Sequence, residues 1–151
     1  MKEHGDSTEL DDHTTVDSDG LISSYWYYTI ANWNKQNHYW VVTHSDFSGH
    51  TFLPRITKKD GIVYIYTKIL ADSGTASKFM VDIEVVNAKN KISLKFPGAK
   101  VYPVDMKWQD VIEDEDGVLS FDQNMAKKLF SVSNTDKTKY VIAHKTTIKQ
   151  K

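Results

Sequence analysis

The sequence predicts an all-β domain, specifically an antiparallel β-sandwich of about seven to eight short strands with one or two short helices. Aromatic residues are abundant, with four Trp and eight Tyr in 151 residues, and aromatic and β-branched side chains favour strands over helices. Several short segments alternate between apolar and polar positions, and turn residues separate them at regular spacing. A pattern of many short strands is typical of two packed sheets.

The expected strands are short and closely spaced. Asp60-Gly61 is the clearest turn, because Asp-Gly supplies the positive-φ residues of a tight hairpin. The segment 62–70 is apolar on both faces and is expected to be a central strand, whereas Pro54 favours an edge or a bulge. We expect strands over 21–30, 38–43, 51–56, 62–70, 79–85, 92–96 and 139–148, a short helix over 105–112 and a second helix from a capping-box-like stretch at Ser120–Gln123.

Composition excludes several classes of function. The formal net charge is -1, from 19 basic and 20 acidic residues, so no global field attracts nucleic acid or an anionic membrane. The absence of cysteine excludes disulfides, Cys-ligated zinc and a thiol nucleophile. We interpret residues 1–12 as a disordered acidic tail without a secretory signal, and 13–151 as one domain. No apolar run approaches the ~18 residues of a membrane span, and a cytoplasmic or nuclear protein is expected.

Three histidines are the main candidates for a metal site. His38, His44 and His50 are spaced by six and lie near Asp46, and imidazole is a common metal ligand. Residues six apart on one strand share a face but lie about 20 Å from each other, which is too far for one ion unless the chain folds back at Gly49. A small histidine-metal enzyme therefore remains a minor alternative, and we assign no catalytic residue, metal or cofactor.

Three further features admit both a structural and a functional interpretation. Trp26, Trp33 and Trp40 fall at intervals of seven, and an exposed Trp on a strand is a platform for peptide or sugar, so a carbohydrate-binding sandwich is a second alternative. The acidic run 113–116 lacks the alternating oxygen ligands of a calcium loop and is interpreted as a solvated loop. The lysine-rich segment 137–151 is expected to form a final strand at a solvated or protected edge, with a nucleic-acid patch as the alternative.

One stretch resembles a known family. Phe121-Asp122, Ala126 and Leu129-Phe130 are spaced as in the substrate-binding domain of the seven-in-absentia (Siah-type) ubiquitin ligases, a member of the TRAF-like or MATH-like sandwiches. Segments 13–16, 39–42, 76–85 and 92–96 resemble that domain in the same order. The resemblance covers most of residues 13–148.

The resemblance implies a non-catalytic domain that binds extended degron peptides of partner proteins by strand addition. Matched by position, its peptide site would comprise Thr14, Val16, Trp40 and Val42, with Asp19 at the rim. The resemblance also implies a homodimer in the ubiquitin pathway. The chain departs from the family because it has no cysteine, and therefore no RING or zinc fingers of its own. Val42 replaces the family's Met, and Tyr39 replaces its acidic residue, so peptide preference is expected to differ.

Overall fold

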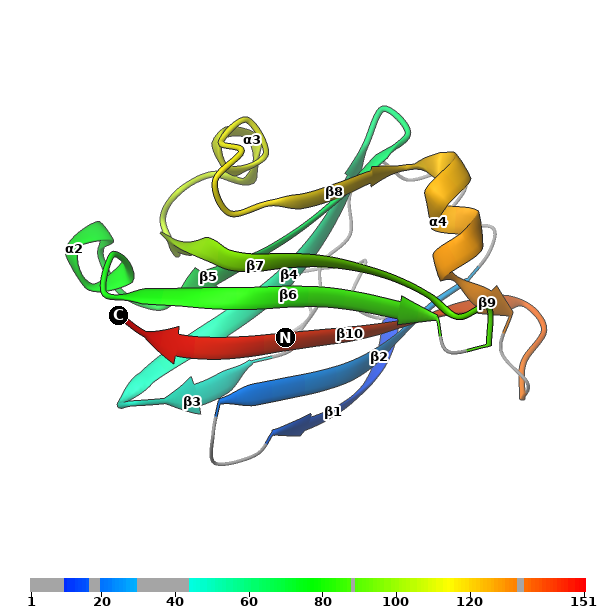
Figure 1. Ribbon diagram of the computed structural model, residues 1–151, viewed down its shortest axis with the longest axis horizontal. Helices are drawn as coiled ribbons and strands as arrows, with labels where there is room; N and C mark the ends of the chain where they lie inside the picture. The colour runs from blue at the N-terminus through cyan, green and yellow to red at the C-terminus, as the bar shows by residue number, and fades with distance from the viewer. Residues whose placement is uncertain (1–9, 17–19, 30–43, 88, 133–134) are drawn as a thin grey trace.

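The computed structural model describes residues 10–16, 20–29, 44–87, 89–132 and 135–151, with 10–16 and 24–29 described by their backbone alone (Figure 1). The strands are β1 Leu10–Val16, β2 Leu21–Thr29, β3 Ser45–Phe47, β4 His50–Lys59, β5 Ile62–Ile69, β6 Phe79–Asn87, β7 Ile92–Pro103, β8 Leu119–Asp122, β9 Ser131–Val132 and β10 Lys139–Gln150. The helices are α2 Ser73–Ala76, α3 Trp108–Val111 and α4 Gln123–Leu129. Among the described residues, no helix has the length and apolar character needed to span a membrane.

The strands form one continuous sheet. Their order is β1-β2-β10-β6-β7-β5-β4-β3, with β8 paired to β5 and β9 paired to β10. The sheet is mixed, because β5 and β7 run parallel over 67–69 and 101–103. It curls into a nearly closed barrel-like body of seven strands, counted from β2 to β3, and β1 continues the sheet beyond β2. The ends of the curl approach at Gly20, where an added Cβ would lie 3.0 Å from the Phe47 ring.

The predicted antiparallel β-sandwich is therefore wrong. The long strand β7 is the reason. Most of it pairs with β6, but its last three residues, Val101–Pro103, leave β6 and pair with β5. One strand thus joins the two halves that a sandwich would keep as separate sheets, and the short-strand pattern of the sequence gives no signal of this shared pairing.

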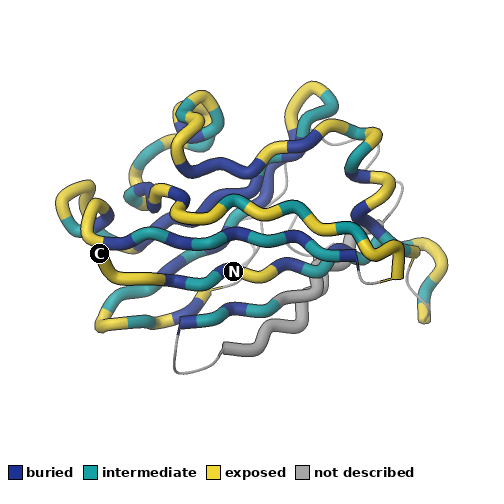
Figure 2. The backbone as a smooth tube through the Cα atoms, viewed as in Figure 1, coloured by how far each residue is buried: buried dark blue, intermediate teal, exposed yellow. Residues whose placement is uncertain are grey.

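Alternating positions along the strands build the interior of the barrel. Phe79, Val81, Ile83 and Val85 of β6 are buried, while the residues between them are half-buried (Figure 2). We call the buried interior the inner cluster. It is formed by Ile22, Phe52, Ile56, Val63, Ile65, Ile69, Ala76, Phe79, Val81, Ile83, Val85, Ala99, Val101, Leu119, Phe121, Ala126, Leu129, Phe130, Ile142 and Ile148.

The helix α4 covers one side of this barrel. Asp122 caps its N-terminus by accepting a hydrogen bond from Met125 N at 2.9 Å, and Ala126 and Leu129 are buried. The expected cap at Ser120 is wrong, because residues 119–122 instead form β8, which pairs with the first half of β5. α4 contacts β5, β6, β7 and β8, so it closes the barrel where β8 replaces β7 beside β5 (Figure 1).

A second apolar cluster lies on the outer face of β5 and β7. We call it the outer cluster. It comprises Tyr66, Tyr102, Val111 and Val118, with Tyr64, Met106, Trp108 and Ile112 packed against them. The segment 104–118, which includes α3, lies over this face, and Lys68 Nζ donates to Met106 O at 2.6 Å. β5 is thus buried on both faces, as its sequence predicted, whereas α3 is shorter than the predicted helix over 105–112.

Turns and strand positions were predicted with mixed success. The Asp60-Gly61 hairpin is confirmed, with φ of 53° and 80°. Pro97-Gly98 does not end a strand, since these two residues form a bulge opposite Asp82, which accepts a hydrogen bond from Gly98 N at 2.8 Å. The lysine-rich strand β10 is not at an edge, because it pairs with β2 on one side and β6 on the other.

Candidate functional site

The strand β1 carries two of the five predicted peptide-binding residues. Thr14 pairs with Ser24 of β2 and Val16 pairs with Ile22. Asp19, Trp40 and Val42 lie outside the described residues. The structure therefore places Thr14 and Val16 on one strand, two residues apart, and the whole predicted groove stays a prediction. β1 begins at Leu10, inside the segment that the sequence analysis assigned to the tail.

β1 is the end of the sheet. It pairs with β2 along its entire seven residues, and no described strand pairs with its other side (Figure 1). In an antiparallel pair, alternate residues of an outermost strand turn their N–H and C=O groups away from the sheet. A strand of seven residues at about 3.4 Å per residue offers an edge of about 24 Å.

The histidine hypothesis receives no support from the described residues. His38 lies outside them, and His44 is exposed just before β3. The chain does fold back at Ser48-Gly49, as the hypothesis required, since Phe47 pairs with His50. His50 then stacks edge-on against Phe79, with ring centroids 5.6 Å apart. Across the described ranges, no three His, Asp or Glu side chains are grouped closely enough to hold a metal ion.

Of the predicted tryptophan platform and the acidic loop 113–116, the structure describes only the acidic loop in full. The side chains of Trp26, Trp33 and Trp40 are outside the description, and Trp108 is half-buried in the outer cluster. In the acidic loop, Asp114 accepts hydrogen bonds from Asp116 N and Lys100 Nζ, both at 3.0 Å. These contacts hold the pKa of Asp114 below its usual value, with the Asp116 backbone bond as the main cause. Asp114 therefore ties the loop to β7.

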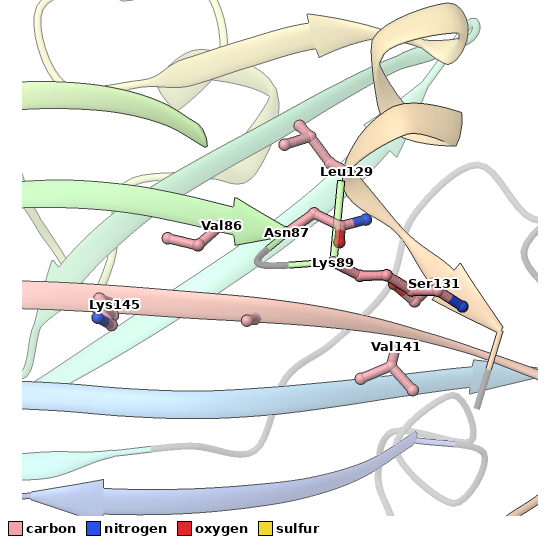
Figure 3. Close-up of a pocket in the computed structure, with 8 residues that line it drawn as sticks. Val86, Asn87, Lys89, Leu129, Ser131, Val141 and Lys145 are labelled. Atoms are coloured by element: carbon pink, nitrogen blue, oxygen red, sulfur yellow. The ribbon is translucent and has the colours of Figure 1, made fainter. Parts of the chain in front are cut away.

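A cavity of about 280 Å³ opens on the outer face of the sheet (Figure 3). We call it the lysine cavity. Its floor comes from β6 and β10, and its rim from the turn after β6 and from β9. It is lined by Val86, Lys89, Ser131, Val141, Ala143 and Lys145, together with Asn87 and Leu129. The sequence gives no signal of this site, because its residues come from three separate segments, 86–89, 129–131 and 141–145, and show no common motif.

The wall of the lysine cavity is fixed by one amide side chain. Asn87 is 4% exposed, and its Nδ2 donates to Lys128 O at 3.0 Å and to Phe130 O at 3.3 Å. Asn90 N donates to Asn87 Oδ1 at 3.1 Å. These bonds join the end of β6 to the end of α4. The rim of the cavity is therefore held in place without any ligand.

A second group that sequence reasoning missed lies inside the barrel. His144 of β10 is fully buried, and its Nε2 is hydrogen-bonded to Thr146 Oγ1 at 2.6 Å. Burial lowers the pKa of His144 to about 3, because a charged imidazolium is poorly solvated there. The imidazole is therefore neutral at physiological pH. Its inward position follows from the alternation of β10, in which 142, 144, 146 and 148 are buried.

The fold and these sites define the chain as a mostly-β, barrel-like domain. Comparison with known protein families found no match, and comparison with curated proteins found none either.

Proposed function

We propose that this chain is a non-catalytic protein-recognition domain that binds an extended segment of a partner along the outer edge of β1. The observation that carries the proposal is the position of β1, which ends the strand order and has no described strand on its outer side. Backbone pairing with an incoming strand supplies affinity, and side chains at alternate positions supply specificity. The partner is therefore a polypeptide, and the domain performs no chemical step on it.

The barrel favours this edge as the docking position. Within the path, β2, β10, β6, β7, β5 and β4 each have a described strand on both sides. β3 ends the path on the other side, but it has only three residues. β1 has seven, and more residues allow more backbone hydrogen bonds. The same edge can also pair with β1 of a second copy, so the predicted homodimer competes with peptide binding.

Proline substitution tests the edge directly. Thr14 and Thr15 are neighbours in β1, so one N–H points toward β2 and the other points outward. Proline removes the N–H. The proline variant that loses the N–H pointing toward β2 (the inward variant) is expected to have a lower melting temperature. The proline variant that loses the outward N–H (the outward variant) should keep the original melting temperature. Peptides selected by the full chain from a phage-displayed library of random dodecapeptides should bind the outward variant about tenfold more weakly, which corresponds to about 1.4 kcal/mol.

Alanine at the same two positions is the matched control, because Thr14→Ala and Thr15→Ala remove a side chain but keep the N–H. Their peptide affinities should change less than those of the outward proline variant. Light scattering across a concentration series shows whether pairing between copies occupies the edge. Selected peptides that bind both folded proline variants as tightly as the original chain would rule out strand addition at β1.

A further inference from the structure

We infer that the lysine cavity binds a carboxylate carried on a short aliphatic stem. This site is independent of the β1 edge, because its floor is formed by β6 and β10 and its rim by β9 and the turn after β6. The inference depends on the apolar floor of the cavity, the two lysines beside it and its small volume.

The floor of the cavity is aliphatic. Val86 and Ala143 are cross-strand partners on β6 and β10, and Val141 lies two residues along from Ala143 on the same face. Each of the three is only half-buried, although it is apolar. A ligand with an aliphatic stem would remove this apolar surface from water, which is favourable.

The charged groups beside the floor are cations. Lys145 and Lys89 are drawn at opposite ends of the cavity (Figure 3), and both are exposed. Neither forms an ion pair with any residue in the described part of the chain. Among the described lining residues there is no Asp or Glu. A ligand with an anionic group therefore complements this lining, because hydrogen bonds between a charged donor and a charged acceptor are stronger than those between neutral groups.

One nearby carboxylate does not cancel this charge. Glu84 lies opposite Lys145 on β10 and opposite Lys95 on β7. A single carboxylate thus stands between two ammonium groups on the same outer face, so net positive charge remains. Lys89, beyond the end of β6, adds to it.

The volume restricts the ligand to a small one. The cavity holds about 280 Å³, just below the range of about 300–1,000 Å³ that is usual for drug-sized ligands. This accommodates an aliphatic chain of a few carbons with one carboxylate. Such a group occurs in free short-chain fatty acids and at the C-terminal residue of a polypeptide that ends in an aliphatic side chain. The recognised chemistry is the same in both.

Titration calorimetry of the full chain tests the site, with sodium hexanoate, hexanol and acetyl-alanyl-leucine as probes. Hexanoate or the acetylated dipeptide is expected to bind, with hexanol at least tenfold weaker. The probe that binds more tightly identifies the source of the carboxylate. Lys145→Ala should weaken binding about tenfold, and Ala143→Leu should abolish it by filling the floor. Lys95→Ala is the matched control, because Lys95 has the same cross-strand neighbour, Glu84, but does not line the cavity.

Two outcomes would overturn the inference. Binding that is equal for hexanoate and hexanol would remove the role of the carboxylate. Binding that survives Ala143→Leu in a variant with an unchanged circular dichroism spectrum would place the ligand elsewhere. The β1 proline variants should bind hexanoate like the original chain, so failure of this site and failure of the β1 edge are distinguishable.

Discussion

The inner and outer clusters differ in how they are built. The inner cluster takes alternate residues from most of the long strands and encloses them within the curled sheet. The outer cluster has four buried residues: Tyr66 and Tyr102 come from the sheet, and Val111 and Val118 come from the single segment 104–118 that lies over it. Hydrogen bonds from Lys68 to Met106 O and from Tyr102 to Asp114 O hold that segment to the sheet. The inner cluster therefore depends on apolar volume, and the outer cluster depends more on specific polar contacts.

The first prediction tests the apolar volume of the inner cluster. Ile65 of β5 is fully buried in it, so Ile65→Ala is expected to lower the free energy of unfolding by about 4 kcal/mol through lost burial and a residual cavity. Urea denaturation measures this. The matched variant is Tyr66→Phe at the next residue, on the opposite face, which loses only the hydrogen bond to Thr57 Oγ1 and should cost about 1 kcal/mol. If Ile65→Ala and Tyr66→Phe lowered the free energy of unfolding equally, the proposed difference between the clusters would be contradicted.

The second prediction tests how tightly the outer segment lies on β7. A Cβ on Gly117 would come 2.4 Å from Lys100 O and 2.7 Å from Tyr102 Cε2. Because the first contact is with backbone, the segment itself must shift, and Gly117→Ala is expected to cost about 3 kcal/mol. Gly74→Ala is the control, since its nearest atom, Asp72 Oδ1, would be 3.6 Å away. A melting temperature unchanged by Gly117→Ala would show that the segment is only loosely attached.

The third prediction concerns the histidine inside the barrel. The pKa of His144 is about 3 when folded, against an ordinary value of 6.5, so the unfolded state binds more protons between these two values. The contribution of neutral His144 to the free energy of unfolding is therefore fully present above pH 6.5. As the pH falls below 6.5, this contribution decreases by about 1.4 kcal/mol per pH unit, and about 2.5 kcal/mol is lost by pH 4.5. Urea denaturation at several pH values measures the slope.

The variant His144→Gln serves as the control for that slope, because its amide does not titrate. The slope between pH 6.5 and 4.5 should flatten, whatever the variant's absolute stability. The lowered pKa values of Asp82 and Asp114 act in a different range, since their contribution is lost only below their ordinary value of 3.8. A slope that is unchanged in the Gln variant would assign the acid sensitivity to another group.

The fourth and smallest effect concerns one hydroxyl of the outer cluster. Tyr102 Oη donates to Asp114 O at 3.2 Å, and Tyr102→Phe is expected to cost about 1 kcal/mol. Amide hydrogen exchange should quicken in residues 110–118 and stay unchanged in β6. Tyr140→Phe is the comparison, because Tyr140 contacts Phe130 through its ring, with centroids 5.7 Å apart. Uniform faster exchange throughout the chain would mean that the two clusters unfold as one unit.

Much of the local structure was predictable from the sequence. The alternation of Phe79, Val81, Ile83 and Val85 predicted β6 and its buried face, and Asp60-Gly61 predicted the hairpin between β4 and β5. The helix α4 was predicted, but its cap was misplaced by two residues, because Ser120 and Asp122 are both favourable caps and pairing of β8 with β5 decides between them.

The candidate sites were harder to predict. Thr14 and Val16 were predicted on one strand and both lie in β1, but their role in peptide binding stays a prediction. The lysine cavity could not be foreseen, since Lys89 and Lys145 are distant in sequence and come to line the same cavity only through the pairing of β6 with β10. The buried His144 had a weak signal, because it shares the parity of Ile142 and Ile148 in an alternating strand.

The sequence by itself determined the β-rich character, many strand positions and the inward face of β6, because alternation is a property of neighbouring residues along one chain. Tertiary structure decided which strands are neighbours. The last residues of β7 leave β6 for β5, β10 takes a central place, and β1 remains at the end of the sheet. These choices depend on contacts between residues far apart in sequence, which local patterns do not encode.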